Sequence, residues 1–458
     1  MPENKIDSTP KPKLRIIDAA ALIIGIVVGA GIFRTPSVVA ANTPNEAWFL
    51  GVWVIGGLIS LIGALCYSEL SSTFPNTGGD YHFLKLAYGK NVSFLFAWSR
   101  ITITQTGSIA LLAYIAGDYL TELLPLGGFS STYYSAAIII TLTLINILGI
   151  QFGTGIQKLL TALQFIGILI IVLTGFLTDT SIVIDNSSQG ALIAEEQAPV
   201  SGLSFTGSIN LALIFVLLTF GGWNEAAYIS SELKSGSKKI SHVLILSIAI
   251  ITILYLLINM ALLKVLGLQG MASSDAVGVD MMRYTLGEKG VLLIGALVVL
   301  SALTSLNTTI FTGARSNYAL GKDFKPLSFL GKWNGEKSAP VNSLILQGII
   351  SVALVIFGAF TRNGFESMVD FTAPVFWLFL LLAGISLFVL RKKRPDAVRP
   401  FKVPLYPLTP ILFVLFCAFM LYSSFSFTGI GSLVGVTVLI IGLIIIVIYN
   451  KKLSKNPQ

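Results

Sequence analysis

A series of apolar stretches, each long enough to cross a membrane, most limits how this chain can fold. They recur from Ile16 to Tyr449 with short polar breaks between them. A helix needs about 20 mainly apolar residues to span the hydrocarbon core of a bilayer. Hydrophobic residues make up 54% of the 458 positions and charged residues only 11%, which excludes a soluble globular protein. We therefore expect an all-α integral membrane protein with about twelve transmembrane helices.

The polar connections between these runs are too short to hold a second domain. The longest cover residues 179–204 and 267–289. We expect one transmembrane domain over residues 1–458. Its parts are five helices in residues 16–178, five more in residues 205–390 and two C-terminal helices in residues 405–449.

The net charge of +8 reflects membrane topology. Clusters of Lys and Arg lie at residues 5–15, 85–90, 234–239, 322–337, 391–402 and 451–455. All of them fall on one side of the membrane if successive helices alternate in direction. The positive-inside rule then predicts a multi-pass protein of the cell membrane with both termini cytoplasmic, and argues against a nucleic-acid partner.

Two of the predicted helices are interrupted by glycines. The first, Ile16–Ala41, contains Gly25, Gly29 and Gly31, and the sixth contains the pair Gly221-Gly222. Each glycine weakens a helix by about 1 kcal/mol relative to alanine. The backbone groups that a break frees need partners in hydrocarbon, so a break is tolerated only where it lines a cavity. The other interpretation is that these glycines allow close helix packing.

The two breaks occupy corresponding positions if the first ten helices form two inverted halves of five. Interrupted helices in corresponding halves point to a transporter binding site. A break exposes N–H groups where its second half begins and carbonyls where its first half ends. Both signs are needed to hold a zwitterion. No residue-level repeat is visible, so this interpretation depends on the breaks alone.

Four blocks carry a resemblance to a known family. They are VVGAGIFRTP, ELSSTFPNTGGDYHFL, FGGWNEAAYISSELKS and TGARSNYALGKDFKPLSFLGK, in this order along the chain. Together they resemble the amino acid–polyamine–organocation (APC) permeases, and within them the L-type amino-acid transporter branch. The resemblance implies a LeuT-like inverted repeat of five plus five helices with broken first and sixth helices, plus two C-terminal helices. It also implies alternating access.

The resemblance implies a substrate site at the two breaks. The substrate carboxylate is expected at the amides of Ala30 and Gly31, beside Gly29. Its amine is expected at the carbonyls of Val27, Leu218 and Gly221. Phe220 is expected to act as a gate and Asn224 to be a polar neighbour.

One position departs from the family pattern. Many members carry a lysine in the fifth helix, thought to stand in for a sodium ion, where this chain has Gln164. A neutral side chain supplies no such charge. Ala302-Leu303-Thr304-Ser305 resembles the segment that gives two hydroxyl ligands, here Thr304 and Ser305, in sodium-coupled relatives of this fold. With the carbonyls of Gly25, Val28 and Ser301, the resemblance implies a candidate sodium site of five oxygens, the ligands that hard cations prefer. Sodium-independent exchange is the competing interpretation.

Other polar residues have more than one interpretation. Arg100 either faces the bundle interior or extends to the cytoplasmic surface. Glu225 can pair with a basic substrate, with Arg100 or with a proton. Hydroxyls in residues 292–319 can be helix–helix contacts that bond back to their own carbonyls. His82 and His242 stand alone, without the clustering of a metal site or an enzyme.

These observations predict a secondary amino-acid transporter, working by symport or exchange. A polyamine or other organic-cation permease is the alternative, and a membrane enzyme or a channel fits less well. No cofactor is expected beyond a coupling ion. The expected partners are an amino-acid substrate and membrane lipid. An accessory subunit stays open, because animal L-type relatives pair with a glycoprotein and bacterial ones work alone. The preferred amino acid, the coupling mode and the oligomeric state also stay open.

Overall fold

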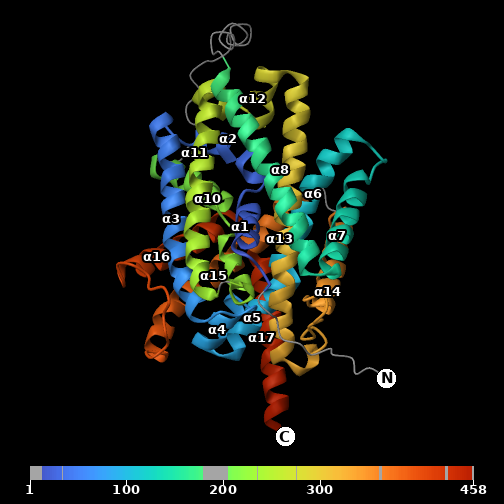
Figure 1. Ribbon diagram of the computed structural model, residues 1–458, viewed down its shortest axis with the longest axis vertical. Coiled ribbons are helices and arrows are strands. Elements are labelled where there is room, and N and C mark those ends of the chain that lie inside the picture. Colours follow the sequence, from blue (N-terminus) through green and yellow to red (C-terminus); the bar gives the residue numbers. More distant parts are fainter. Residues whose placement is uncertain are drawn as a thin grey trace.

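The computed structural model describes residues 13–33, 35–178, 205–234, 236–274, 276–359, 364–428 and 432–455. Over these residues the chain is helical, apart from turns and two isolated β-bridges. Most long helices run roughly along the long axis of the molecule (Figure 1). Within the described residues, nine helices are long and apolar enough to cross a membrane. The chain is therefore a multi-pass membrane protein.

The elements follow one another with short connections. Before residue 179 they are α1 (Ile16–Val27), η1 (Ala30–Phe33), α2 (Thr35–Ala41), α3 (Glu46–Thr73), α4 (Asp80–Tyr88), α5 (Lys90–Ser99), η2 (Arg100–Thr104), α6 (Gln105–Leu123), α7 (Ser130–Leu148) and α8 (Ile150–Leu177). After residue 204 they are α10 (Phe205–Thr219), η4 (Trp223–Glu232), η5 (Ser237–Lys239), α11 (Ile240–Ala272), α12 (Val277–Leu286), α13 (Glu288–Asp323), η6 (Lys325–Leu327), α14 (Val341–Gly358), α15 (Gly364–Lys393), α16 (Leu408–Thr428) and α17 (Ser432–Lys455).

The predicted break in the first helix is present. α1 ends at Val27, Val28 has a non-helical ψ of 72°, and the chain resumes as the short 3₁₀ segment η1. α1 packs against α8, α11 and α13, and Figure 1 shows it near the middle of the bundle. This packing holds the break away from lipid, as the cost of free backbone groups in hydrocarbon requires.

The predicted break in the sixth helix is also present. α10 ends at Thr219, and Gly222 takes a φ of 106° before the 3₁₀ segment η4. Only glycine adopts this backbone readily. A Cβ at Gly222 would also lie 3.2 Å from Ile26, so the two breaks approach each other closely. The hydroxyls of Thr35 and Thr219 hydrogen-bond at 2.7 Å beside them.

Two regions differ from the sequence-based expectation. The third predicted helix is divided into α5, the π-helical turn η2 and α6, with the irregular turn at the polar residues Arg100–Thr104. The predicted polar connection 267–289 is largely helical, because α11 continues through a kink at Gly267 and α12 follows it. The predicted connection 179–204 lies outside the described residues.

Candidate functional site

A cavity of about 410 Å³ lies beside the two breaks. This volume is within the range of small-molecule sites. Six of the eight residues predicted for the substrate line it: Val27, Gly29, Gly31, Leu218, Gly221 and Asn224. The sequence-based choice of both breaks therefore identifies one continuous site, contributed by α1, η1, α10 and the turn before η4.

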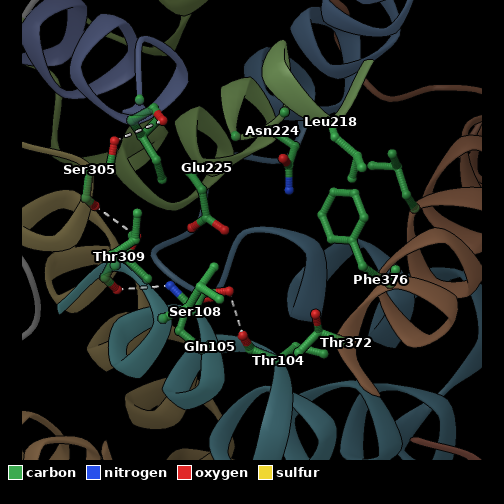
Figure 2. A pocket seen from close by; sticks show the side chains of 18 of the residues that line it. Thr104, Gln105, Ser108, Leu218, Asn224, Glu225, Ser305, Thr309, Thr372 and Phe376 are labelled. Atoms are coloured by element: carbon green, nitrogen blue, oxygen red, sulfur yellow. Dashed lines mark hydrogen bonds between the residues drawn. The ribbon is translucent and has the colours of Figure 1, made fainter. Parts of the chain in front are cut away.

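The rest of the cavity wall is part polar and part apolar. Figure 2 shows Asn224 and Glu225 entering from one side and Thr104, Gln105 and Ser108 from η2 and α6 on another, with Phe376 near Leu218. Gln105 is held in place, because its Nε2 donates to the carbonyl of Thr309 at 2.8 Å. Thr104, Ser108, Thr309 and Phe376 were not predicted, since their facing depends on how the helices dock.

A tyrosine connects the two breaks. The Tyr255 hydroxyl lies 2.7 Å from the Val27 carbonyl and 3.1 Å from the Thr219 carbonyl. The Val27 carbonyl also accepts from the Gly29 amide at 2.8 Å. The amides of Ala30 and Gly31 begin η1, where the first N–H groups of a helix have no intrahelical partner. The amides are thus the freer backbone groups here, and they suit a carboxylate.

Phe220 lies away from the cavity, unlike most of the residues predicted for the substrate site. Its side chain is fully buried and packs against Tyr255 and Trp53, with ring centroids 4.9 and 6.3 Å away. It does not line the cavity in this arrangement, and a gating role for Phe220 stays a prediction. Among the described residues, Phe376 of α15 is one of three phenylalanines that line the cavity, with Phe96 and Phe379, and it lies next to Leu218 (Figure 2).

Two carbonyl oxygens of the candidate sodium site already accept hydrogen bonds, that of Val28 from Gln164 and that of Gly25 from Ser305, whereas the Thr304 and Ser305 hydroxyls act as donors. Gln164 Nε2 donates to the Val28 carbonyl and, at 3.0 Å, to Ser301 Oγ. The Thr304 hydroxyl donates back to Leu300 at 2.6 Å. The Gln164 N–H groups directed at the Val28 carbonyl and at Ser301 Oγ would repel a cation at that side of the site, so the placement of Gln164 argues against a sodium ion there.

The close-packing interpretation applies most clearly to Gly25, beside the closer approach of the two breaks at Gly222. A Cβ at Gly25 would lie 2.2 Å from Gln157 Nε2 and 2.6 Å from Thr304. The Gly25 carbonyl accepts from Ser305 Oγ at 3.0 Å. Gly25 therefore serves the contact of α1 with α8 and α13, whereas Gly29 and Gly31 line the cavity.

Three buried charged residues complete the cavity. Arg100 donates two hydrogen bonds, of 3.0 and 3.1 Å, to the carboxylate of Glu225, and both side chains are buried. This excludes the interpretation in which Arg100 extends to the surface. Asp80, the first residue of α4, also lines the cavity and is 4% exposed. The sequence gives Asp80 no signal beyond its position after two glycines.

Comparison with known proteins places these features in a family. A family model described as "Amino acid permease" matches residues 14–450. The chain belongs to the amino acid permease family. As a member it is an amino acid transporter, which confirms both the resemblance and the function predicted from the sequence.

Individual relatives agree with this assignment. The permease is 28% identical to b(0,+)-type amino acid transporter 1 of Mus musculus, over 89% of this chain and 81% of the relative. It is 29% identical to the cystine/glutamate transporter of Homo sapiens, over 93% and 84%. It is 28% identical to Asc-type amino acid transporter 1 of Mus musculus, over 94% and 80%. The family and these relatives are transporters.

Proposed function

We propose that the permease binds the zwitterionic part of an amino acid at the two helix breaks and carries it by alternating access, in symport or exchange. The amides of Ala30 and Gly31 receive the carboxylate. The carbonyls of Leu218 and Gly221 receive the ammonium group. The third predicted acceptor, the Val27 carbonyl, already accepts from Tyr255 and from the Gly29 amide, so it is free for the ammonium group only if one of these hydrogen bonds opens. The observation that carries this proposal is that both breaks line one cavity.

The charge and the size of the site both suit an amino acid. An N–H group at a helix start carries a partial positive charge, and a carbonyl at a helix end a partial negative one. Glycines at both breaks leave room for a ligand to reach the backbone. The side chain of the substrate then lies among Phe376, Leu218 and the polar residues of α6, which select among amino acids.

The proposal includes an arrangement in the membrane. Twelve spans result if α1 to α2, α5 to α6, α10 to η4 and α17 each count as one crossing beside the other long helices. The first ten then form a LeuT-like inverted repeat. The distribution of Lys and Arg supports cytoplasmic termini in a cell membrane.

Transport is proposed to proceed without sodium. The hydrogen bonds of Gln164 to Val28 and Ser301 join the break of the first helix to α8 and α13, which is the connection that a cation would otherwise make. Uptake of labelled amino acid into proteoliposomes should be unchanged when potassium replaces sodium. A several-fold loss of uptake without sodium would overturn this part of the proposal.

The binding site itself is tested by thermal shift on the purified permease. A ligand that binds only the folded state raises its stability, by about 2.7 kcal/mol at a hundred times the dissociation constant. The panel contains the amino acids, their methyl esters, which lack the carboxylate, and a polyamine. We expect a shift with amino acids and none with the esters. A shift with the polyamine alone would favour an organic-cation permease.

A further inference from the structure

The buried charges that line the cavity do not balance. Among the described residues that line the cavity, Arg100 is the one cation, and Asp80 and Glu225 are the two carboxylates. All three are less than a tenth exposed. Removing an uncompensated charge from water is expensive. When two carboxylates share one site, the usual result is that one of them takes a proton.

The geometry distinguishes the two carboxylates. Glu225 is held by both terminal nitrogens of Arg100, a bidentate pairing that stabilises its charged form. Asp80 has no such partner. Its Oδ2 accepts a long hydrogen bond of 3.4 Å from Tyr228, and the Tyr67 hydroxyl and the Asn224 amide are the other polar groups that interact with the carboxylate. Its buried Oδ1 has no hydrogen bond of good geometry in the described part of the chain. Asp80 is therefore the carboxylate that gains most from a proton.

The backbone before Asp80 fixes its position. Gly79 has a φ of 49°, and a Cβ there would lie 2.7 Å from the ring of Tyr228. This close contact sets the first turn of α4 against η4. The same tyrosine ring lies 4.5 Å from the Arg100 guanidinium, so Tyr228 touches both charged residues. The backbone of Asp80 is therefore held beside Tyr228 by the close contact of Gly79 with that ring.

Asp80 faces polar and charged side chains from α3, η2 and η4. Tyr67 of α3, Arg100 of η2, and Asn224, Glu225 and Tyr228 of η4 face it. The charged residues that α13 and α15 bring to α4 are engaged elsewhere: Asp323 bonds Tyr81 and Lys85, and Lys393 bonds the carbonyl of Ala87. Burial raises the pKa of Asp80 to about 6, which agrees with this environment.

We propose that Asp80 is a proton-binding residue of the permease, and that its proton crosses the membrane with the amino acid. A proton from water binds the carboxylate when the cavity is open to the more acidic side. The neutral acid then permits the cavity to close around the balanced Arg100–Glu225 pair. On the other side, water reaches the carboxyl group and takes the proton. This rests on the proposed function, because the coupled solute is its substrate.

The test uses the full chain in proteoliposomes under an inward gradient of about two pH units. With one proton per substrate, wild-type protein should accumulate labelled amino acid up to roughly 100-fold, since each pH unit corresponds to about tenfold. Asp80→Asn, a permanently neutral mimic, should lose this accumulation, and any exchange of amino acid that it retains should no longer depend on pH. Asp80→Glu should recover the accumulation. Asp396→Asn, in an exposed loop, is the matched control and should behave as wild type.

The outcomes separate this inference from the proposed function. Wild-type exchange of amino acid without any response to the gradient would overturn proton coupling and leave the function standing. An Asp80→Asn protein that still accumulates substrate like wild type would also overturn it. If no amino acid is exchanged at all, the proposed function fails. Proton binding is then judged by infrared difference spectra between acidic and neutral pH. A carboxyl band of the wild-type protein must be missing from the spectra of Asp80→Asn. If Asp80→Asn does not fold, the same band must shift in Asp80→Glu.

Discussion

Arg100 holds Glu225 through two nearly parallel hydrogen bonds inside a chain that is otherwise poor in charge. The two residues come from different helices, η2 and η4, each of which departs from regular α-helix at this point. The pair therefore joins the irregular turn of the third helix to the segment after the break of the sixth. Both residues also line the cavity.

Breaking this pair should be costly. Arg100→Met leaves Glu225 and Asp80 as buried carboxylates without a cation, and removal of one partner of a buried ion pair costs about 3–5 kcal/mol. The melting temperature in detergent should fall sharply. The double variant Arg100→Met/Glu225→Gln should lose much less than the sum of the two single variants, because no unpaired charge at either position remains. Additive losses would show that the pair contributes little.

The stability of the permease should depend on pH through Asp80, which lies in α4 outside the long apolar helices. Its pKa is raised from 3.8 to about 6 in the folded protein. The folded state thus favours the protonated form. The stabilisation of the folded state by protonation of Asp80 is complete below pH 3.8 and is lost as the pH rises through about 6. Each unit of pKa shift corresponds to about 1.4 kcal/mol, so the free energy of unfolding should decrease by roughly 3 kcal/mol.

The measurement is the melting temperature of wild type and Asp80→Asn between acidic and neutral pH. Wild type should lose stability relative to the variant as the pH rises, and Asp80→Asn should be the more stable protein at neutral pH. Parallel curves would contradict a raised pKa at this residue.

Local sequence predicted the breaks well and the facing of side chains poorly. Glycines at Gly29, Gly221 and Gly222 weaken a helix wherever it packs, so both breaks could be found from the chain alone. Phe220 could not be placed, because helical periodicity ends at Thr219 and no longer determines which way the next side chain turns. Asp80 and Tyr255 reach the site from α4 and α11, and only tertiary packing brings them there.

Tyr255 should couple the two breaks. Its hydroxyl is the shared donor between the Val27 and Thr219 carbonyls, and the ring is fully buried. Tyr255→Phe removes that donor and leaves a buried carbonyl poorly satisfied, at a cost of about 1–3 kcal/mol. Tyr284→Phe, on a half-exposed residue of α12, is the matched control and should be neutral. Equal melting temperatures for the two variants would mean that the hydrogen bond has no net effect.

Gly29→Ala should separate binding from stability. A Cβ at Gly29 would lie 3.3 Å from Ser305 Oγ, close enough to need only a small adjustment, and this glycine lines the cavity. One added methyl group in a fitted pocket changes discrimination by about 10- to 200-fold. We expect the affinity for amino acids to decrease by a factor in that range, while the melting temperature without ligand changes little. Gly51→Ala is the control, since no atom lies within 4 Å of its added Cβ. Titration of both variants by thermal shift gives the comparison, and unchanged affinity in Gly29→Ala would place the substrate away from the break of the first helix.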